Sequence, residues 1–203
     1  WDIRGKALGV DVTLETYPYP VGSSFPCSFF PGPWHEGGPR EILKRMKDPK
    51  VKSQYLKTLQ ARPVREMAGN LWTWIGSEKN KRLEGMLWED AARERGVSVE
   101  EMVWDVIVEE EMTCGFRGAP PQSVRLWRQV EQDVMTLLAR PDYMVGSDAI
   151  PVGGLPHPRA FGCFPRVVGR LRRRFGYPLE QVVKRGTQNP AARCWVARGS
   201  GPA

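Results

Sequence analysis

Residues 144–171 read MVGSDAIPVGGLPHPRAFGCFPRVVGRL, and the interpretation of the whole chain starts from this stretch. The apolar run at 143–146 (YMVG) ends in Ser147-Asp148, which is typical of a short buried strand with an acid at its carboxyl end. A loop rich in glycine and proline follows over 149–159. Helical patterns then cover 160–175 and 179–187.

Strand and loop patterns also occur earlier in the chain. Residues 10–16 (VDVTLET) alternate apolar and polar side chains and lead to Tyr17, which predicts a strand that ends at this tyrosine. Residues 18–39 are dense in Pro, Gly, Ser and aromatic side chains, so we expect a long loop. The short apolar run at 71–75 (LWTWI) predicts a further strand.

Helices are predicted between these strands. Apolar spacing indicates a helix over 40–59, interrupted near Pro49, and another over 122–138. Ser98 and Glu101 form a capping box, which marks the start of a further helix. The fold class is therefore α/β, as a piece of an α/β barrel or of an open α/β sheet. The barrel is favoured because both strand ends, at Tyr17 and Asp148, precede long loops, as at the catalytic mouth of such barrels.

The composition is that of a soluble globular protein. The chain has 203 residues, 41% of them hydrophobic and 26% charged, which excludes disorder and fibrous repeats. No apolar run approaches the roughly 20 residues of a membrane-spanning helix, and the first residues lack the apolar core of a signal peptide. We therefore predict a cytoplasmic protein without a membrane partner. The formal net charge of +7 is compatible with anionic partners but does not identify one.

Cysteine and histidine are sparse. The four cysteines form no C-x-x-C pair, so buried thiols are predicted in place of a zinc ribbon or a disulfide framework. With only two histidines, a self-contained zinc site would need Asp, Glu or Cys for its other ligands. The chain starts at Trp1 and stops at RGSGPA, from which we expect a piece of something larger.

Several motifs resemble those of one enzyme family, the N-acyl-D-amino-acid deacylases, which are the D-aminoacylase branch of the amidohydrolase superfamily. The first group lies within the stretch quoted above: Val145 to Asp148 (VGSD), His157-Pro158-Arg159, Phe161-Gly162-Cys163-Phe164-Pro165-Arg166, and Gly169-Arg170. Further matches occur in the same order as in the family: Tyr17-Pro18-Tyr19 with Gly22-Ser23, Pro33 to Gly38 (PWHEGG), Ala92 to Val99 (ARERGVSV), and Thr187-x-Asn189-Pro190-Ala191.

This resemblance implies the C-terminal portion of a metal-dependent (β/α)8 TIM-barrel amidohydrolase that is incomplete in this chain. Residues 1–187 would belong to the barrel domain, with the long loop 18–39 and a helical insertion at 40–138. Residues 188–203 would begin the return to a truncated β-sandwich. The implied activity is hydrolysis of the amide bond of N-acyl (D-)amino acids, with zinc as the expected cofactor.

The resemblance also assigns roles to residues. Asp148 would be the catalytic base and acid, and it is a candidate metal ligand, with the other ligands expected upstream of this chain. Tyr17 would act on the scissile carbonyl, while Arg159 and Ser23 would bind the substrate carboxylate. A guanidinium suits that task because its planar fork pairs with a carboxylate bidentately. His157 would bind substrate through a loop hydrogen bond more readily than it would bind a metal.

Simpler structural roles remain open for the same residues. Asp148 could be a turn or helix-cap aspartate, Arg159 a surface arginine, and Tyr17 a packed aromatic side chain. The basic stretch Arg170-Leu171-Arg172-Arg173-Arg174 could bind nucleic acid, but an outer helix face in solvent is the favoured interpretation, so no nucleic-acid partner is predicted. The interleaved tryptophans are expected in a core or an interface.

Departures from the family limit the functional expectation. Glu15 stands where the family usually has Asp, and Ala149 where it usually has Gly. The family's His-x-His, metal-bound cysteine and His-His-Lys strand have no counterpart here. We therefore predict that this chain is inactive alone, and a second chain that completes the barrel, or a homo-oligomer, is a possible partner. The alternative is a non-catalytic amidohydrolase-like remnant or interaction module.

Overall fold

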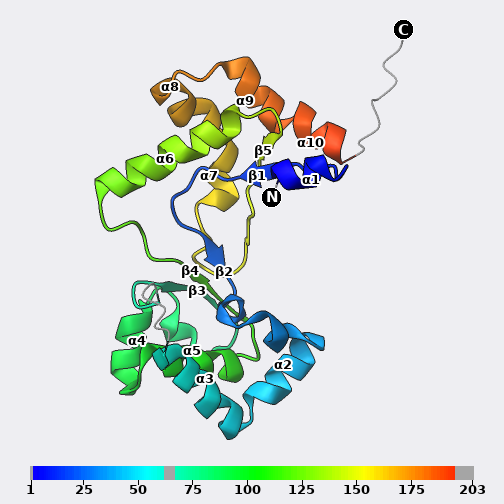
Figure 1. The fold of residues 1–203 in the computed structure, drawn as a ribbon. Coiled ribbons are helices and arrows are strands. Elements are labelled where there is room, and N and C mark those ends of the chain that lie inside the picture. Colours follow the sequence, from blue (N-terminus) through cyan, green and yellow to red (C-terminus); the bar gives the residue numbers. More distant parts are fainter. Residues whose placement is uncertain (1, 62–66, 195–203) are drawn as a thin grey trace. The chain divides into compact units, whose positions relative to one another are not determined.

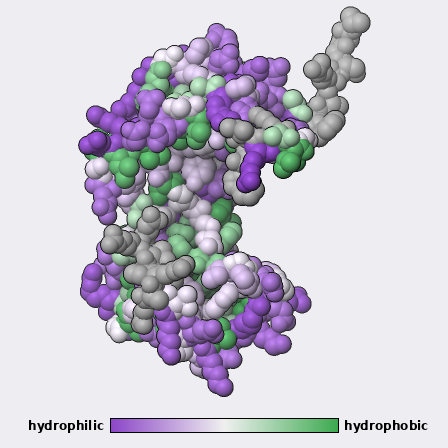
Figure 2. All heavy atoms as spheres, in the orientation of Figure 1, coloured by the Kyte–Doolittle hydropathy of each residue, from purple (hydrophilic) through white to green (hydrophobic). Residues whose placement is uncertain are grey.

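The computed structural model describes residues 2–61 and 67–194, which form two compact units. The first unit comprises 1–20, 121–149 and 158–203, and the second comprises 21–120 and 150–157. Both units mix helices and strands, as Figure 1 shows. Hydrophilic side chains cover much of the outer surface of each unit (Figure 2).

The first unit is built on a parallel pair of strands, β1 (Leu14–Thr16) and β5 (Tyr143–Val145). Leu14 pairs with Tyr143 and Thr16 with Val145. Its helices are α1 (Asp2–Ala7), α6 (Val124–Ala139), α7 (Arg159–Arg166), α8 (Arg172–Arg174), α9 (Leu179–Gly186) and α10 (Gln188–Arg193). Because the strands are parallel, the residues that follow them, Tyr17 and Gly146, lie at the same end of the sheet.

The core of this unit lies between β5 and the helices α6, α7 and α9. It contains Val134, Met135, Leu138, Val145, Cys163, Val167, Leu171 and Val182. A π-helical turn at Val167–Leu171 joins α7 to α8, two residues after Pro165, which has no backbone N–H to donate. The helix predicted at 160–175 is thus present, with a local irregularity at its proline.

The second unit contains an antiparallel sheet in the order β2 (Ser23–Ser24), β4 (Cys114–Arg117), β3 (Leu71–Ile75). Its helices are α2 (Gly38–Met46), α3 (Pro49–Ala61), α4 (Trp88–Arg95) and α5 (Val99–Glu109), with 3-10 turns at Pro26–Phe29, Gly32–His35 and Lys81–Leu83. The predicted capping box is confirmed, because the Ser98 hydroxyl accepts a hydrogen bond of 3.1 Å from the Glu101 N–H.

Aromatic side chains dominate the core of the second unit. Trp104 is 1% exposed, and its ring centroid lies 4.8 Å from that of Tyr55 and 5.7 Å from that of Phe30. Trp72 and Trp88 are fully buried, with ring centroids 5.0 Å apart. These tryptophans are therefore core residues, whereas Trp127 of the first unit is only half-buried.

The element boundaries differ from the sequence expectation in three places. The predicted loop 18–39 includes β2 and two 3-10 turns, and α2 begins inside it at Gly38. The predicted helical insertion 40–138 contains β3 and β4 and divides between the units after Pro120. Strand β4 escaped prediction because its four residues, CGFR, are too few to show an alternating pattern. Residues 188–193 form α10, and the rest of the expected sandwich segment, 195–203, lies outside the described residues.

Among the helices of the described ranges 2–61 and 67–194, none is long and apolar enough to cross a membrane.

Three of the four cysteines are buried as predicted, but Cys194 is exposed. Burial raises the pKa of Cys27 and of Cys163 to about 11. We expect a thiol reagent at pH 8 to label Cys194 in the native chain and all four cysteines in denaturant, as measured by mass spectrometry. Rapid native labelling of Cys163 would contradict its burial.

The raised thiol pKa values also predict a loss of stability in alkali. Unfolded thiols lose their protons near their ordinary pKa of 9.0, whereas the folded Cys27 and Cys163 retain them to about 11. Between these values the unfolded chain binds fewer protons, so the free energy of unfolding falls as pH rises. Urea unfolding at pH 8 and pH 10.5 measures this fall, which should shrink in the Cys27→Ala/Cys163→Ala variant.

Candidate functional site

The carboxyl ends of β1 and β5 carry the polar residues that the sequence singled out. Tyr17 directly follows β1, and Asp148 lies three positions beyond the end of β5. Asp148 has a φ of +44°, in the left-handed region that aspartate adopts more readily than most side chains. Its carboxylate is 60% exposed, so it can reach a reactant from solvent.

Arg159 links these two residues. It is the first residue of α7, and its side chain is only 1% exposed. Its Nη1 lies 2.9 Å from Oδ2 of Asp148, and its guanidinium carbon lies 4.6 Å from the centroid of the Tyr17 ring. The surface role that was left open for Arg159 is therefore wrong. Tyr17, Asp148 and Arg159, which were predicted separately, form one cluster at the strand ends.

The turn that carries Asp148 begins at Gly146, against which the Glu15 carboxylate packs. A Cβ at this position would lie 2.5 Å from Oε2 and 2.7 Å from Oε1 of Glu15, so a larger residue would displace this carboxylate. The Gly146 N–H donates to the Thr16 carbonyl at 3.1 Å, and the Cys163 Sγ donates to the Gly146 carbonyl at 2.9 Å. Glu15 and Cys163 thus both contact the turn, and no local sequence pattern predicts these contacts.

Ser23 and His157 belong to the second unit, not to the cluster of the first. Ser23 is in β2 and pairs with Arg117 of β4. His157 is 3% exposed and ends the segment 150–157. Ser23 is half-buried and His157 is buried, and their substrate-binding roles stay predictions.

The described residues do not fit a metal ion by themselves. Nowhere in 2–61 or 67–194 do three or more His, Cys, Asp or Glu side chains gather closely enough to hold one. The carboxylate of Asp148 is engaged by Arg159, and the nearby Cys163 is a buried thiol whose pKa is raised to about 11, whereas metal ligation requires a thiolate. Asp148 alone falls short of the three or four protein ligands of a zinc site.

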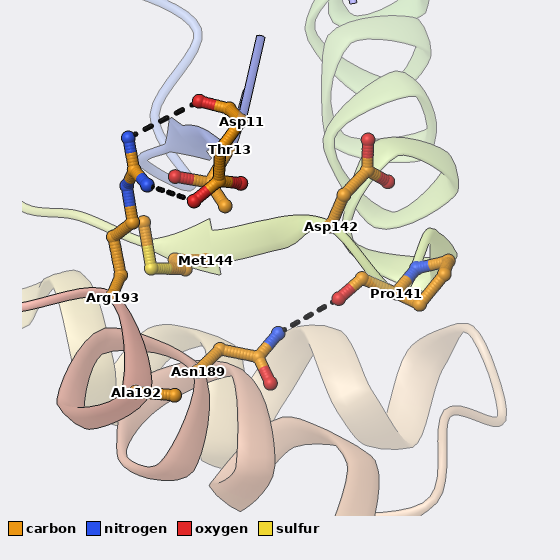
Figure 3. Close-up of a pocket in the computed structure, with 8 residues that line it drawn as sticks. All are labelled: Asp11, Thr13, Pro141, Asp142, Met144, Asn189, Ala192 and Arg193. Atoms are coloured by element: carbon orange, nitrogen blue, oxygen red, sulfur yellow. Dashed lines mark hydrogen bonds and ion pairs between the residues drawn. The ribbon is translucent and has the colours of Figure 1, made fainter. Parts of the chain in front are cut away.

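A pocket of about 270 Å³ lies at the opposite ends of the same strands (Figure 3). It is lined by residues that include Thr13, Asp142 and Met144, and α10 contributes Asn189 and Arg193. Arg193 forms an ion pair with Asp11, so a charged group on each side of the pocket is already neutralised. The lining side chains Arg193 and Asn189 thus contact residues of the first unit itself, and these contacts are structural.

Asn189, from the motif that resembles T-x-N-P-A, holds the start of β5. Its Nδ2 donates to the Pro141 carbonyl at 2.9 Å and to the Tyr143 carbonyl at 3.0 Å. We expect Asn189→Ala to lower the free energy of unfolding by about 1–3 kcal/mol, because two carbonyls lose their donor. Urea unfolding measures the change. Gln188→Ala, at an exposed neighbouring position, should have little effect, and an equal effect of both variants would contradict this role.

The basic stretch 170–174 is not simply a solvated helix face. Glu131 of α6 is 1% exposed. Its Oε1 lies 2.5 Å from Nη2 of Arg166 and 3.9 Å from Nη2 of Arg170, and its Oε2 lies 2.8 Å from Nη1 of Arg174. The Trp127 Nε1 donates to the same carboxylate at 3.2 Å. Two arginines of the stretch therefore neutralise a buried acid and are not free to bind a nucleic acid through all their donors.

Comparison with known proteins first gives the class. No protein-family model matches the sequence. Solved structures of D-aminoacylases, described as a subset of the amidohydrolases, align with 96% of this chain at TM-scores of 0.59 and 0.60 and sequence identities of 29% and 30%. The chain covers only 31% of those structures. It is thus an α/β chain similar to part of an amidohydrolase.

Within that class the similarity is to D-aminoacylases, as the motifs predicted. The D-aminoacylase of Alcaligenes xylosoxydans xylosoxydans is 46% identical over 68 residues, which are 33% of this chain and 14% of that protein. An N-acyl-D-glutamate deacylase of Bordetella bronchiseptica, solved with zinc and a phosphonate inhibitor, aligns over 94% of this chain and 30% of its own length. Its TM-score is 0.59, and its 24% identity shows the fold alone.

Proposed function

We propose that this chain supplies part of an amidohydrolase that cleaves the amide bond of N-acyl (D-)amino acids, and that it is inactive alone. The observation that carries the proposal is the cluster of Asp148, Arg159 and Tyr17 at the carboxyl ends of a parallel strand pair. In α/β barrels this is the end at which catalytic residues are placed. The similarity to D-aminoacylases over nearly the whole chain supports the same reaction.

In this proposal each residue of the cluster has a separate task. The exposed carboxylate of Asp148 accepts a proton from the attacking water and returns it to the leaving amine. The Tyr17 hydroxyl donates a hydrogen bond to the oxygen on which negative charge develops. Arg159 binds the substrate carboxylate, and Ser23 and His157 are further proposed substrate-binding residues.

The ion pair between Arg159 and Asp148 adds a condition to this scheme. Nη1 of Arg159 already lies 2.9 Å from Oδ2 of Asp148. A substrate carboxylate therefore has to share the guanidinium with Asp148 or displace Asp148 from it. A planar guanidinium carries five N–H donors and can bind two carboxylates at once. Sharing would bring the substrate next to the proton-transfer residue.

Beyond the cluster, the chain would form part of a larger barrel. Residues 1–187 would belong to the last part of a (β/α)8 barrel, and the β1–β5 pair would be two neighbouring strands of it. Zinc ligands would come from other strands, since the described residues contain no cluster of three ligands. A second chain, a copy of this one, or a longer polypeptide would supply those strands.

The second candidate is a non-catalytic amidohydrolase-like module. Two observations favour it: the described residues contain no group of three or more His, Cys, Asp or Glu side chains that could hold a metal ion, and the proposed base is paired with an arginine. A module of this kind would keep the fold without turnover.

Amine release from N-acetyl-D-amino acids, measured together with zinc content by elemental analysis, separates the two candidates. The 203-residue chain should contain no zinc and show no turnover, whereas the protein from the complete reading frame that contains it should show both. Stoichiometric zinc and turnover in the 203-residue chain would disprove the claim that it is inactive alone. A metal-loaded complete protein without turnover would favour the non-catalytic module.

A further inference from the structure

A pocket on the outer side of the first unit is unrelated to the strand-end cluster. It has a volume of about 510 Å³ and lies between α6 and the end of α8. From α6 it is lined by Arg125, Arg128, Gln129 and Gln132, which occupy one stripe of the helix at spacings of three and four. Arg174 and Phe175 line the other side. We call this the arginine pocket.

The arginine pocket carries positive charge without a lining carboxylate. Its lining includes three guanidiniums, from Arg125, Arg128 and Arg174, and no acidic residue. Because Nη1 of Arg174 is paired with the buried Glu131, the uncompensated charge is that of Arg125 and Arg128. Arg125 and Arg128 are exposed and three positions apart, a spacing at which like charges on a helix repel each other. An anion between these guanidiniums would relieve the repulsion.

The acids Glu131 and Asp133 of α6 already have partners, and one of these partners, Gln129, lines the arginine pocket. Glu131 is 1% exposed and is held by Arg166 and Arg174 on the inner side of the helix. Asp133 accepts a hydrogen bond of 2.9 Å from the Gln129 Nε2. Among the described residues, neither acid pairs with Arg125 or Arg128, so these two cations remain available to a ligand.

The donor set selects the chemistry of that ligand. Guanidinium groups present parallel N–H donors that match the oxygens of a phosphate, and glutamine amides add neutral donors. The Phe175 ring and the Val124 side chain give the pocket an apolar wall. The pocket is open to solvent, so a small ligand can enter it.

We propose that the arginine pocket binds a phosphate-bearing small anion, with the phosphate held by Arg125 and Arg128 and by the Arg174 donors that do not face Glu131. The ligand is either a free diphosphate or an organic phosphate ester whose apolar part contacts Phe175. This site does not depend on the proposed hydrolase activity, because it lies on α6 and α8 and uses none of the strand-end residues.

Isothermal titration of the 203-residue chain with pyrophosphate and with phenyl phosphate at low salt tests the site. The pocket variant is Arg125→Gln/Arg128→Gln. The matched control is Arg173→Gln/Lys184→Gln, which removes the same charge from exposed positions outside the pocket. The pocket variant should weaken binding by about tenfold or more, and the control by less than about twofold. All four substituted side chains are exposed, and circular dichroism confirms that each variant is folded.

Tighter binding of phenyl phosphate identifies an organic ester as the ligand class, and tighter binding of pyrophosphate identifies a diphosphate. Equal losses in the two double variants would overturn the site, because the binding would then reflect diffuse surface charge. Absence of saturable binding to the wild-type chain would also overturn the site. Much tighter binding of an oligonucleotide than of either small phosphate, compared at equal phosphate concentration, would overturn it as well.

Discussion

Replacing Asp148 by Asn is expected to lower kcat of the complete, metal-loaded enzyme by about 10²- to 10⁴-fold, with a smaller change in KM. Amide hydrolysis needs a group that removes a proton from water and delivers one to the leaving amine, and an amide side chain does neither. Asn has nearly the same shape as Asp, and the position is 60% exposed, so the fold should be retained.

The measurement is steady-state amine release by the protein from the complete reading frame, with zinc content determined for each variant. Asp142→Asn, at the opposite end of the same strand, is the matched control and should keep its kcat. Retention of more than a tenth of kcat by Asp148→Asn would rule out the proton-transfer role. Loss of zinc together with activity would assign Asp148 to the metal site instead.

Replacing Glu131 by Ala is expected to lower the free energy of unfolding by about 3–5 kcal/mol. The buried carboxylate holds Arg166 at 2.5 Å and Arg174 at 2.8 Å, and these contacts join α6 to the helices after β5. Without Glu131, guanidiniums that are 15% and 34% exposed face each other without a counter-charge. The loss is therefore larger than for a solvent-exposed ion pair.

Urea unfolding followed by far-ultraviolet circular dichroism measures this loss. Asp133→Asn is the control, since Asp133 is an exposed acid two positions along the same helix, and it should change stability by about 0.5 kcal/mol or less. Glu131→Gln, which keeps the size and one acceptor, should fall between the two. A loss below about 1 kcal/mol for Glu131→Ala would show that the cluster behaves like surface ion pairs.

The sequence predicted elements where a local pattern exists. The strand at 71–75 and the capped start of α5 were predicted correctly because LWTWI and the Ser98–Glu101 spacing are local signals. Strand β4 was missed because it is short and is stabilised by pairing with both β2 and β3. Its existence depends on partners that lie far away in the sequence.

The candidate site was predicted in composition but not in arrangement. Motif resemblance selected Asp148, Arg159 and Tyr17, and the structure brings them together. The resemblance implies that Arg159 binds the substrate and that Asp148 transfers the proton, but it does not indicate that the two residues form an ion pair. That contact depends on the turn at Gly146 and on the position of α7 after an irregular loop, and both are set by tertiary packing.

The parallel pairing of β1 with β5 has a consequence for the kinetics of folding. Leu14 and Tyr143 are paired although they lie about 130 positions apart along the chain, and closing a loop of this size carries a large entropic cost that slows folding. Almost all of the second unit is contained in that intervening segment. If it condenses first, it shortens the effective loop and brings the two strands within reach of each other. We therefore expect the strand-end cluster to form in a late, slow phase whose rate is controlled by residues of the second unit, such as Trp104, and not by the cluster itself.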